Sequence, residues 1–104
     1  MYNKNKNTNQ DTEIVRVRLP RNGELLGLVV MLTGGSRLQV DCTDGKTRMC
    51  RIPGKFRRDI WVRANDYVIV KPWPIQADER GDIIWRYTKL QADWLKKKGH
   101  LKNL

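Results

Sequence analysis

The sequence contains little of the chemistry that enzymes and metal sites use. Its 104 residues include one histidine, His100, and two cysteines, Cys42 and Cys50. A metal site needs about four nitrogen or sulfur ligands, and His100 stands far from both cysteines in a basic tail. No HExxH, P-loop or CxxC motif is present. We therefore expect no catalytic residue, no metal and no cofactor. Among a disulfide, half a metal site and buried thiols, we favour buried free thiols on neighbouring strands.

Long apolar runs are also missing. No stretch approaches 18 apolar residues, which excludes a membrane-spanning helix. The first residues, MYNKNKNTNQDTE, lack the apolar region of a signal peptide, so we expect a cytoplasmic protein. These residues, 1–13, have almost nothing to bury and are predicted to form a disordered polar tail.

Positive charge is abundant and concentrated in two stretches. The formal net charge is +10. Between Lys46 and Lys71 the only acids are Asp59 and Asp66, and the last ten residues contain lysines but no acid. Charge this localised indicates a surface for a polyanion such as nucleic acid. The basic residues of the first stretch are Lys46, Arg48, Arg51, Lys55, Arg57, Arg58, Arg63 and Lys71.

The hydrophobic pattern predicts a small, mostly β domain. Asp44-Gly45 is a strong signal for a two-residue hairpin turn between two strands. Gly27 lies inside a long apolar run and predicts a bulge or bend there. The predicted strands are 24–33, 37–43, 46–52, 66–72 and 82–87, and residues 14–19 should form either a short strand or an extended lead-in.

A two-residue turn would fix the register of the central hairpin. It would place Val40 opposite Met49 and Asp41 opposite Arg48, and a bulge near residues 49–51 would then be needed to turn Ile52 inward. The core face would consist of Leu38, Val40, Cys42 and Met49, and the solvent face of Arg37, Gln39, Asp41 and Arg48.

Two helices complete the prediction. Residues 55–61 should form one or two helical turns anchored by Phe56, Ile60 and Trp61. Residues 88–98 should form a helix with a Thr88–Gln91 capping box and Gly99 just past its end. Its apolar face would comprise Leu90, Trp94 and Leu101.

Five strands with a short helix between the third and fourth is the order of an OB-fold barrel. We assign residues 14–88 to the barrel and 89–104 to the C-terminal helix and basic tail. OB-folds bind ligands on strands 2 and 3, here with Arg37, Gln39, Arg48 and Arg51 beside Lys55, Arg57 and Arg58. Since the tryptophans all have plausible packing roles, this face is expected to lack a stacking platform. It should therefore recognise folded RNA by shape and backbone.

Several motifs together resemble one known family. The segments DGKTRMCRIPGKFRRDIWVR, VIVKPW, DIIWRYTK and WLKKKG, with GELLGLVVMLTGGSRLQV upstream, are similar to translation initiation factor 1A in its archaeal form. The resemblance covers about residues 22–100.

This resemblance implies an S1-like OB barrel, shared with bacterial initiation factor 1. It implies a partner as well, the RNA of the small ribosomal subunit near the A site, where the protein would help initiator tRNA and other initiation factors assemble on the start codon. We expect it to act as a monomer. The RNA-contacting residues that match the family motif are Arg48, Arg51, Lys55, Arg57, Arg58 and Trp61, followed by Arg63 and Lys71.

Other interpretations of the basic surface remain open. A general single-stranded RNA-binding chaperone would need exposed aromatic residues on the ligand face. A protein-docking module would show little dependence on salt, whereas phosphate contacts would weaken steeply as salt rises. An ordinary basic surface without a ligand is the remaining alternative.

Overall fold

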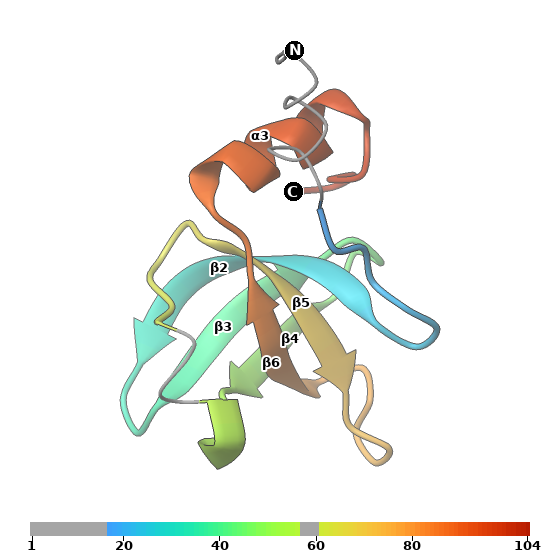
Figure 1. Cartoon of the computed structure of the whole chain (residues 1–104). Coiled ribbons are helices and arrows are strands. Elements are labelled where there is room, and N and C mark those ends of the chain that lie inside the picture. Colours follow the sequence, from blue (N-terminus) through green and yellow to red (C-terminus); the bar gives the residue numbers. More distant parts are fainter. Residues whose placement is uncertain (1–16, 57–60) are drawn as a thin grey trace, which may run out of the picture.

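The computed structural model describes residues 17–56 and 61–104, and its regular structure is mostly β (Figure 1). The predicted tail, residues 1–13, and positions 14–16 lie outside the described residues. Of the short strand or extended lead-in predicted at 14–19, residues 17–19 are described and form no strand, which leaves the lead-in. The elements are β2 (Leu25–Thr33), β3 (Arg37–Cys42), β4 (Thr47–Arg51), η1 (Gly54–Phe56), β5 (Tyr67–Pro72), β6 (Arg80–Arg86) and α3 (Lys89–Lys97).

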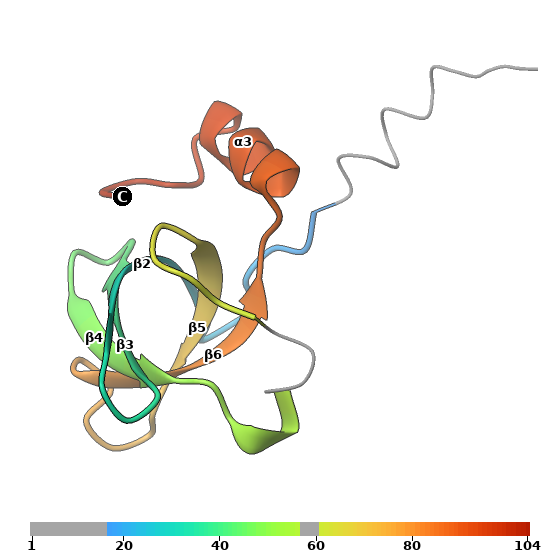
Figure 2. The ribbon, with the colours of Figure 1, turned by 90° about the vertical axis from the view of Figure 1, so that its left-hand side faces the viewer.

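The five strands close into a barrel in the order β2-β3-β4-β6-β5. Neighbouring strands are antiparallel except β4 and β6, which are parallel. The 3-10 turn η1 follows the third strand in chain order, before the fourth. This arrangement confirms the predicted OB-fold, and Figure 2 shows the closed barrel.

Small apolar side chains fill the barrel. Val29, Val40, Val68, Val70 and Ile83 are completely buried there. A β-carbon on Gly27 would lie 2.5 Å from Val40 Cγ1, so this glycine permits close packing of β2 against β3. The strand irregularity predicted at Gly27 instead lies between Val29 and Met31, with another between Ile69 and Val70.

The two cysteines are buried free thiols on neighbouring strands, as predicted. Burial raises the pKa of both, that of Cys50 to about 12. The thiols are therefore protonated and inert at neutral pH, and they serve as small apolar groups of the core.

The central hairpin has a three-residue turn rather than the predicted two-residue turn. The Cys42 amide donates to the Lys46 carbonyl, and the Gly45 amide donates to the Cys42 carbonyl. Gly45 has φ +85°, the left-handed conformation that closes a three-residue loop. As a result Val40 pairs with Arg48, and Gln39 pairs with Met49.

This shift of one residue reverses the predicted faces of β4. Arg48 and Cys50 are buried, whereas Met49 is only half-buried on the outer side. The register runs without interruption from Asp41–Thr47 to Arg37–Arg51, so the predicted bulge at residues 49–51 is absent. Ile52 packs against the core without it.

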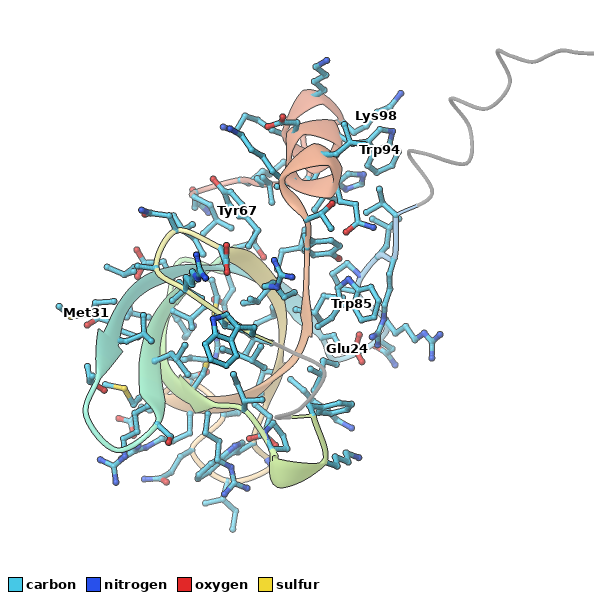
Figure 3. The ribbon with its side chains drawn as sticks, turned by 60° about the vertical axis from the view of Figure 1, so that its left-hand side comes forward. Glu24, Met31, Tyr67, Trp85, Trp94 and Lys98 are labelled. Carbon is cyan, nitrogen blue, oxygen red and sulfur yellow. The ribbon has the colours of Figure 1, made fainter. Side chains whose placement is uncertain are left out.

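The helix α3 covers one end of the barrel (Figure 2). The predicted Thr88–Gln91 capping box is present, and Gly99 has φ +78° after the C-cap. The buried helix residues are Ala92 and Leu95. Of the predicted apolar face, Trp94 and Leu101 pack against the core, whereas Leu90 is 52% exposed. Lys98, the C-cap residue of α3, places its Nζ 5.9 Å from the centroid of the Trp94 ring (Figure 3).

Within the described ranges, no helix combines the length and the apolar character needed to span a membrane.

A second apolar cluster attaches α3 to the barrel. It combines Leu95 with Leu26, Ile69 and Tyr87, and Val17 packs against it. The Tyr87 hydroxyl donates to the Arg18 carbonyl, which fixes the segment before β2. The barrel is therefore covered over parts of β2, β5 and β6. None of the buried residues of this cluster comes from β3 or β4.

Candidate RNA interface

Four side chains form a row across the outer face of the barrel. Arg37 of β3 pairs with Arg51 of β4, Arg51 pairs with Asp82 of β6, and Asp82 pairs with Lys71 of β5. Residues paired in register point to the same face of a sheet. We call Arg37, Arg51, Asp82 and Lys71 the outer row. It brings three of the predicted RNA-binding residues together on the ligand face of the OB-fold.

The carboxylate of the outer row holds two neighbours in place. Asp82 Oδ1 accepts a hydrogen bond of 2.8 Å from the Trp73 indole nitrogen and one of 3.1 Å from Arg51 Nε. The Arg51 guanidinium carbon lies 5.1 Å from the centroid of the Trp73 ring, within the range of a cation–π contact. Arg51 nevertheless keeps a side-chain exposure of 58%.

Lys55 extends the basic surface beyond the row. It belongs to η1, is exposed, and places its Nζ 5.1 Å from the centroid of the Phe56 ring. Lys55, Lys71, Trp73 and Asp82 line one hollow of about 420 Å³. Among the described residues, no ion pair engages Arg37, Lys55 or Lys71. All three cations are exposed to solvent.

Arg48 does not lie on this exposed surface, contrary to the prediction. It is 3% exposed, and its two Nη atoms donate to the two carboxylate oxygens of Asp44 at 3.1 and 2.9 Å. Its Nε donates to the Ala77 carbonyl at 2.6 Å. The hydrogen bond with Asp44 raises the pKa of Arg48 and lowers that of Asp44. The one-residue shift of the hairpin turns this side chain inward, where it joins the β3–β4 turn to the β5–β6 loop.

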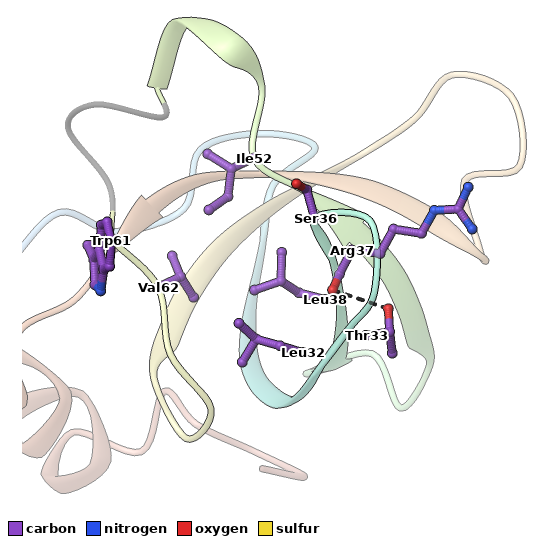
Figure 4. Close-up of a pocket in the computed structure, with 8 residues that line it drawn as sticks. All are labelled: Leu32, Thr33, Ser36, Arg37, Leu38, Ile52, Trp61 and Val62. Carbon is purple, nitrogen blue, oxygen red and sulfur yellow. Dashed lines mark hydrogen bonds between the residues drawn. The ribbon is translucent and has the colours of Figure 1, made fainter.

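Trp61 is exposed rather than packed as an anchor. Its exposure is 72%, and it borders a pocket of about 370 Å³ with Leu32, Leu38, Ile52 and Val62 (Figure 4). The Arg37 guanidinium points away from this pocket in Figure 4. The packing role expected for Trp61 is therefore wrong. Of the helical turns predicted at 55–61, residues 55 and 56 belong to η1, residue 61 is not helical, and positions 57–60 lie outside the described residues.

The remaining predicted residues are dispersed. Gln39 is half-buried further along β3 from the outer row. Lys46 is exposed at the hairpin turn, at the opposite end of β4 from Arg51. Arg63 is exposed between η1 and β5. Arg57 and Arg58 lie outside the described residues.

Two neighbours of the outer row are missed by reasoning from the sequence. The pattern assigns Trp73 to packing and Arg80 to a loop. Arg80 is instead the first residue of β6 and pairs with Met49 of β4. The parallel pairing of the third and fifth barrel strands, which the OB-fold implies, could have revealed Arg80. In the described part of the chain, no cluster of three or more histidine, cysteine or acidic residues could hold a metal ion.

Comparison with known proteins identifies the family. Residues 11–103 match the family described as translation initiation factor 1A / IF-1. The chain belongs to this family. Translation initiation factor 1A of Methanococcus aeolicus is 60% identical over 89 residues, 84% of this chain and 85% of that protein. The Methanopyrus kandleri protein of the same name is 53% identical over 91 residues, 88% of this chain and 81% of that one.

A solved structure agrees with this family. The solution structure of translation initiation factor 1 from the wolbachia endosymbiont strain TRS of Brugia malayi superposes with a TM-score of 0.52 and 26% identity, covering 69% of this chain and 84% of that one. Membership confirms the resemblance found in the sequence motifs. It also supports a role in translation initiation, in a family of factors that are not enzymes.

Proposed function

We propose that this translation initiation factor binds the RNA of the small ribosomal subunit near the A site. There it promotes assembly of initiator tRNA and other initiation factors on the start codon. The observation that carries the proposal is the outer row with Lys55, which presents exposed cations on the ligand face of an OB-fold. In this account the protein works as a cytoplasmic monomer.

The solvent exposure of each described side chain decides whether it can contact the RNA. We propose that Arg37, Arg51, Lys55 and Lys71 neutralise phosphates, and that Arg57, Arg58 and Trp61 contribute to RNA binding as well. In this proposal Gln39, Lys46 and Arg63 make only peripheral contacts with the RNA. Arg48 supports the fold instead, because its donors are already engaged by Asp44 and Ala77.

In this proposal the protein acts by occupying a site in the folded RNA of the subunit. A rigid barrel that neutralises phosphates in a folded RNA pocket fills the space that another ligand would enter. Phosphate contacts position a protein on RNA without reading the sequence, so the shape of the RNA supplies the specificity. Since the cations are held on strands of a closed barrel, little ordering is needed on binding.

A second candidate function is general binding of single-stranded RNA. Trp61 favours it, because an indole that is 72% exposed beside a basic surface can stack on a base. The two functions differ in their preference for RNA: a chaperone binds any unstructured strand, whereas the proposed factor requires the folded subunit.

The test is binding of the fluorescently labelled protein to isolated small ribosomal subunits and to unstructured oligouridine. We expect saturable one-to-one binding to subunits, strongly preferred over oligouridine. The variant Lys55→Ala/Arg57→Ala/Arg58→Ala should lose it, whereas Lys97→Ala/Lys98→Ala/Lys102→Ala, with the same loss of charge on the C-terminal segment, should retain it. Equal affinity for oligouridine would favour the chaperone, and full binding by the first variant would contradict the proposed surface.

A further inference from the structure

A small hollow on the outer face of the barrel contains three arginines. It measures about 280 Å³ and lies where β3, β4 and the start of β6 meet. Arg37, Arg51 and Arg80 line it together with Met49 and Trp73, and no acidic residue of the described chain does so. We call it the triple-arginine hollow. It lies on the other side of Arg37 from the Trp61 pocket, with which it shares only Ser36 and Arg37.

The strand registers force these positive charges together. Arg37 stands directly opposite Arg51, and Arg80 stands opposite Met49, further along β4. Like charges directly opposite one another destabilise a sheet. Arg51 is compensated by Asp82, but within the described residues no acid pairs with Arg37 or Arg80. An external anion between these two side chains would supply the missing counter-charge.

Two of the side chains that line the hollow, Arg51 and Trp73, are already held in place. Trp73 and Arg51 stack on one another, and both donate to the same oxygen of Asp82. Holding both groups in advance removes much of the side-chain entropy that binding would otherwise cost. An indole or guanidinium plane is a good stacking surface for a nucleobase. Asp82 is therefore a positioning residue for these two side chains.

We propose that the triple-arginine hollow binds one unpaired nucleotide of the RNA. Its phosphate lies between Arg37 and Arg80, and its base lies against the Arg51–Trp73 stack. The inference rests on the proposed function and adds to it a discrete site for a single nucleotide. An acidic peptide would satisfy the arginines but would leave the Trp73 indole and the Arg51 guanidinium plane without a stacking partner. For that reason the combination favours a nucleotide.

The first experiment titrates the full-length ¹⁵N-labelled protein with adenosine 5′-monophosphate. The Trp73 indole N–H resonance, identified by its loss in Trp73→Leu, reports on the wall of the hollow. We expect it to shift saturably, with adenosine and inorganic phosphate each binding about tenfold more weakly because each supplies half of the contacts. No shift, an equal affinity for phosphate alone, or stronger binding of a hexaglutamate peptide would each overturn the proposal.

The second experiment uses Arg80→Gln, with Lys102→Gln as the control for loss of one positive charge. Circular dichroism verifies that both are folded. Arg80→Gln should weaken binding of adenosine 5′-monophosphate and of small ribosomal subunits about tenfold, and the control should not. If the unaltered protein binds subunits and Arg80→Gln binds them equally well, the nucleotide site is wrong and the proposed function stands. If the unaltered protein fails to bind subunits, the proposed function is wrong, and the titration still decides whether the hollow takes a nucleotide.

Discussion

Arg48 and Arg51 belong to the same strand, β4, yet they occupy opposite environments. Arg48 points inward, is 3% exposed, and donates to Asp44 and the Ala77 carbonyl. Arg51 points outward with a side-chain exposure of 58%, and it shares Asp82 with Trp73. The first arginine connects two loops of the barrel, and the second presents a guanidinium to solvent.

The comparison shows that the side of the strand decides what a cation can do. Both arginines belong to the same basic stretch and contribute equally to the net charge. Only a cation whose donors remain accessible can neutralise a phosphate. Counting basic residues therefore overestimates the binding surface, whereas the strand register selects the cations that belong to it.

The largest expected effect is on stability. Arg48→Leu should lower the free energy of unfolding by about 3 kcal/mol, because it removes the buried partner of Asp44 and leaves the Ala77 carbonyl without its donor. Arg51→Leu, the matched change on the outer face, should cost less than about 1 kcal/mol. Urea denaturation of both variants checks the difference, and equal losses would contradict the inward and outward assignment.

The Asp44–Arg48 pair also predicts a change in stability at acidic pH. The hydrogen bond from Arg48 lowers the pKa of Asp44 below its ordinary value of 3.8. A carboxyl with a lowered folded-state pKa stabilises the protein fully above its unfolded pKa and loses this contribution as the pH falls through the folded one. Stability should thus fall below about pH 4. Asp44→Asn should remove this part of the pH dependence, and denaturation between about pH 2 and pH 6 measures it; an unchanged profile would contradict the pair.

A substitution at the outward position 49 should perturb the fold least, and it tests the register of the β3–β4 hairpin directly. Met49 is outward and half-buried, whereas Cys42 and Cys50 are buried with raised pKa values. Met49→Cys should therefore react readily with a thiol reagent at about pH 8, while the two native thiols react only after unfolding. The unaltered protein is the control. Fast labelling of a native cysteine, or protection of the new one, would support the two-residue turn instead.

Much of the barrel is predictable because apolar runs and turn residues mark strands well. The strands expected at 24–33, 37–43, 46–52 and 66–72 agree with β2, β3, β4 and β5 to within a residue or so at each end. The hairpin register is not predictable in the same way. Asp-Gly suits both a two-residue turn and a three-residue turn with glycine in the left-handed region, and the choice reverses the faces of the next strand.

The candidate site is predicted only in part, because the strand register decides which side chains reach the outer face. Arg37 has the parity that the sheet requires, so the pattern places it on the correct face. Arg51 is expected on this face only because of the predicted bulge, whereas the three-residue turn brings it there without one. The hydrophobic pattern does not distinguish a packing role from a binding role for Trp61 or Trp73, since an indole suits a core as well as a stacking surface, and only the family resemblance indicates Trp61. Arg80 depends on knowing which strands are neighbours, a property of the topology rather than of local pattern.

The central claim, that the outer row contacts RNA phosphates, is tested most directly by the salt dependence of binding to small ribosomal subunits. The variant Arg37→Gln/Arg51→Gln/Lys71→Gln is compared with Lys97→Gln/Lys98→Gln/Lys102→Gln, which loses the same charge elsewhere. For the unaltered protein, the logarithm of the affinity should fall linearly with the logarithm of the salt concentration. The outer-row variant should lower this slope by about 2 to 3, and the control should leave it unchanged. Equal slopes for all three proteins would contradict the assignment of RNA binding to this face.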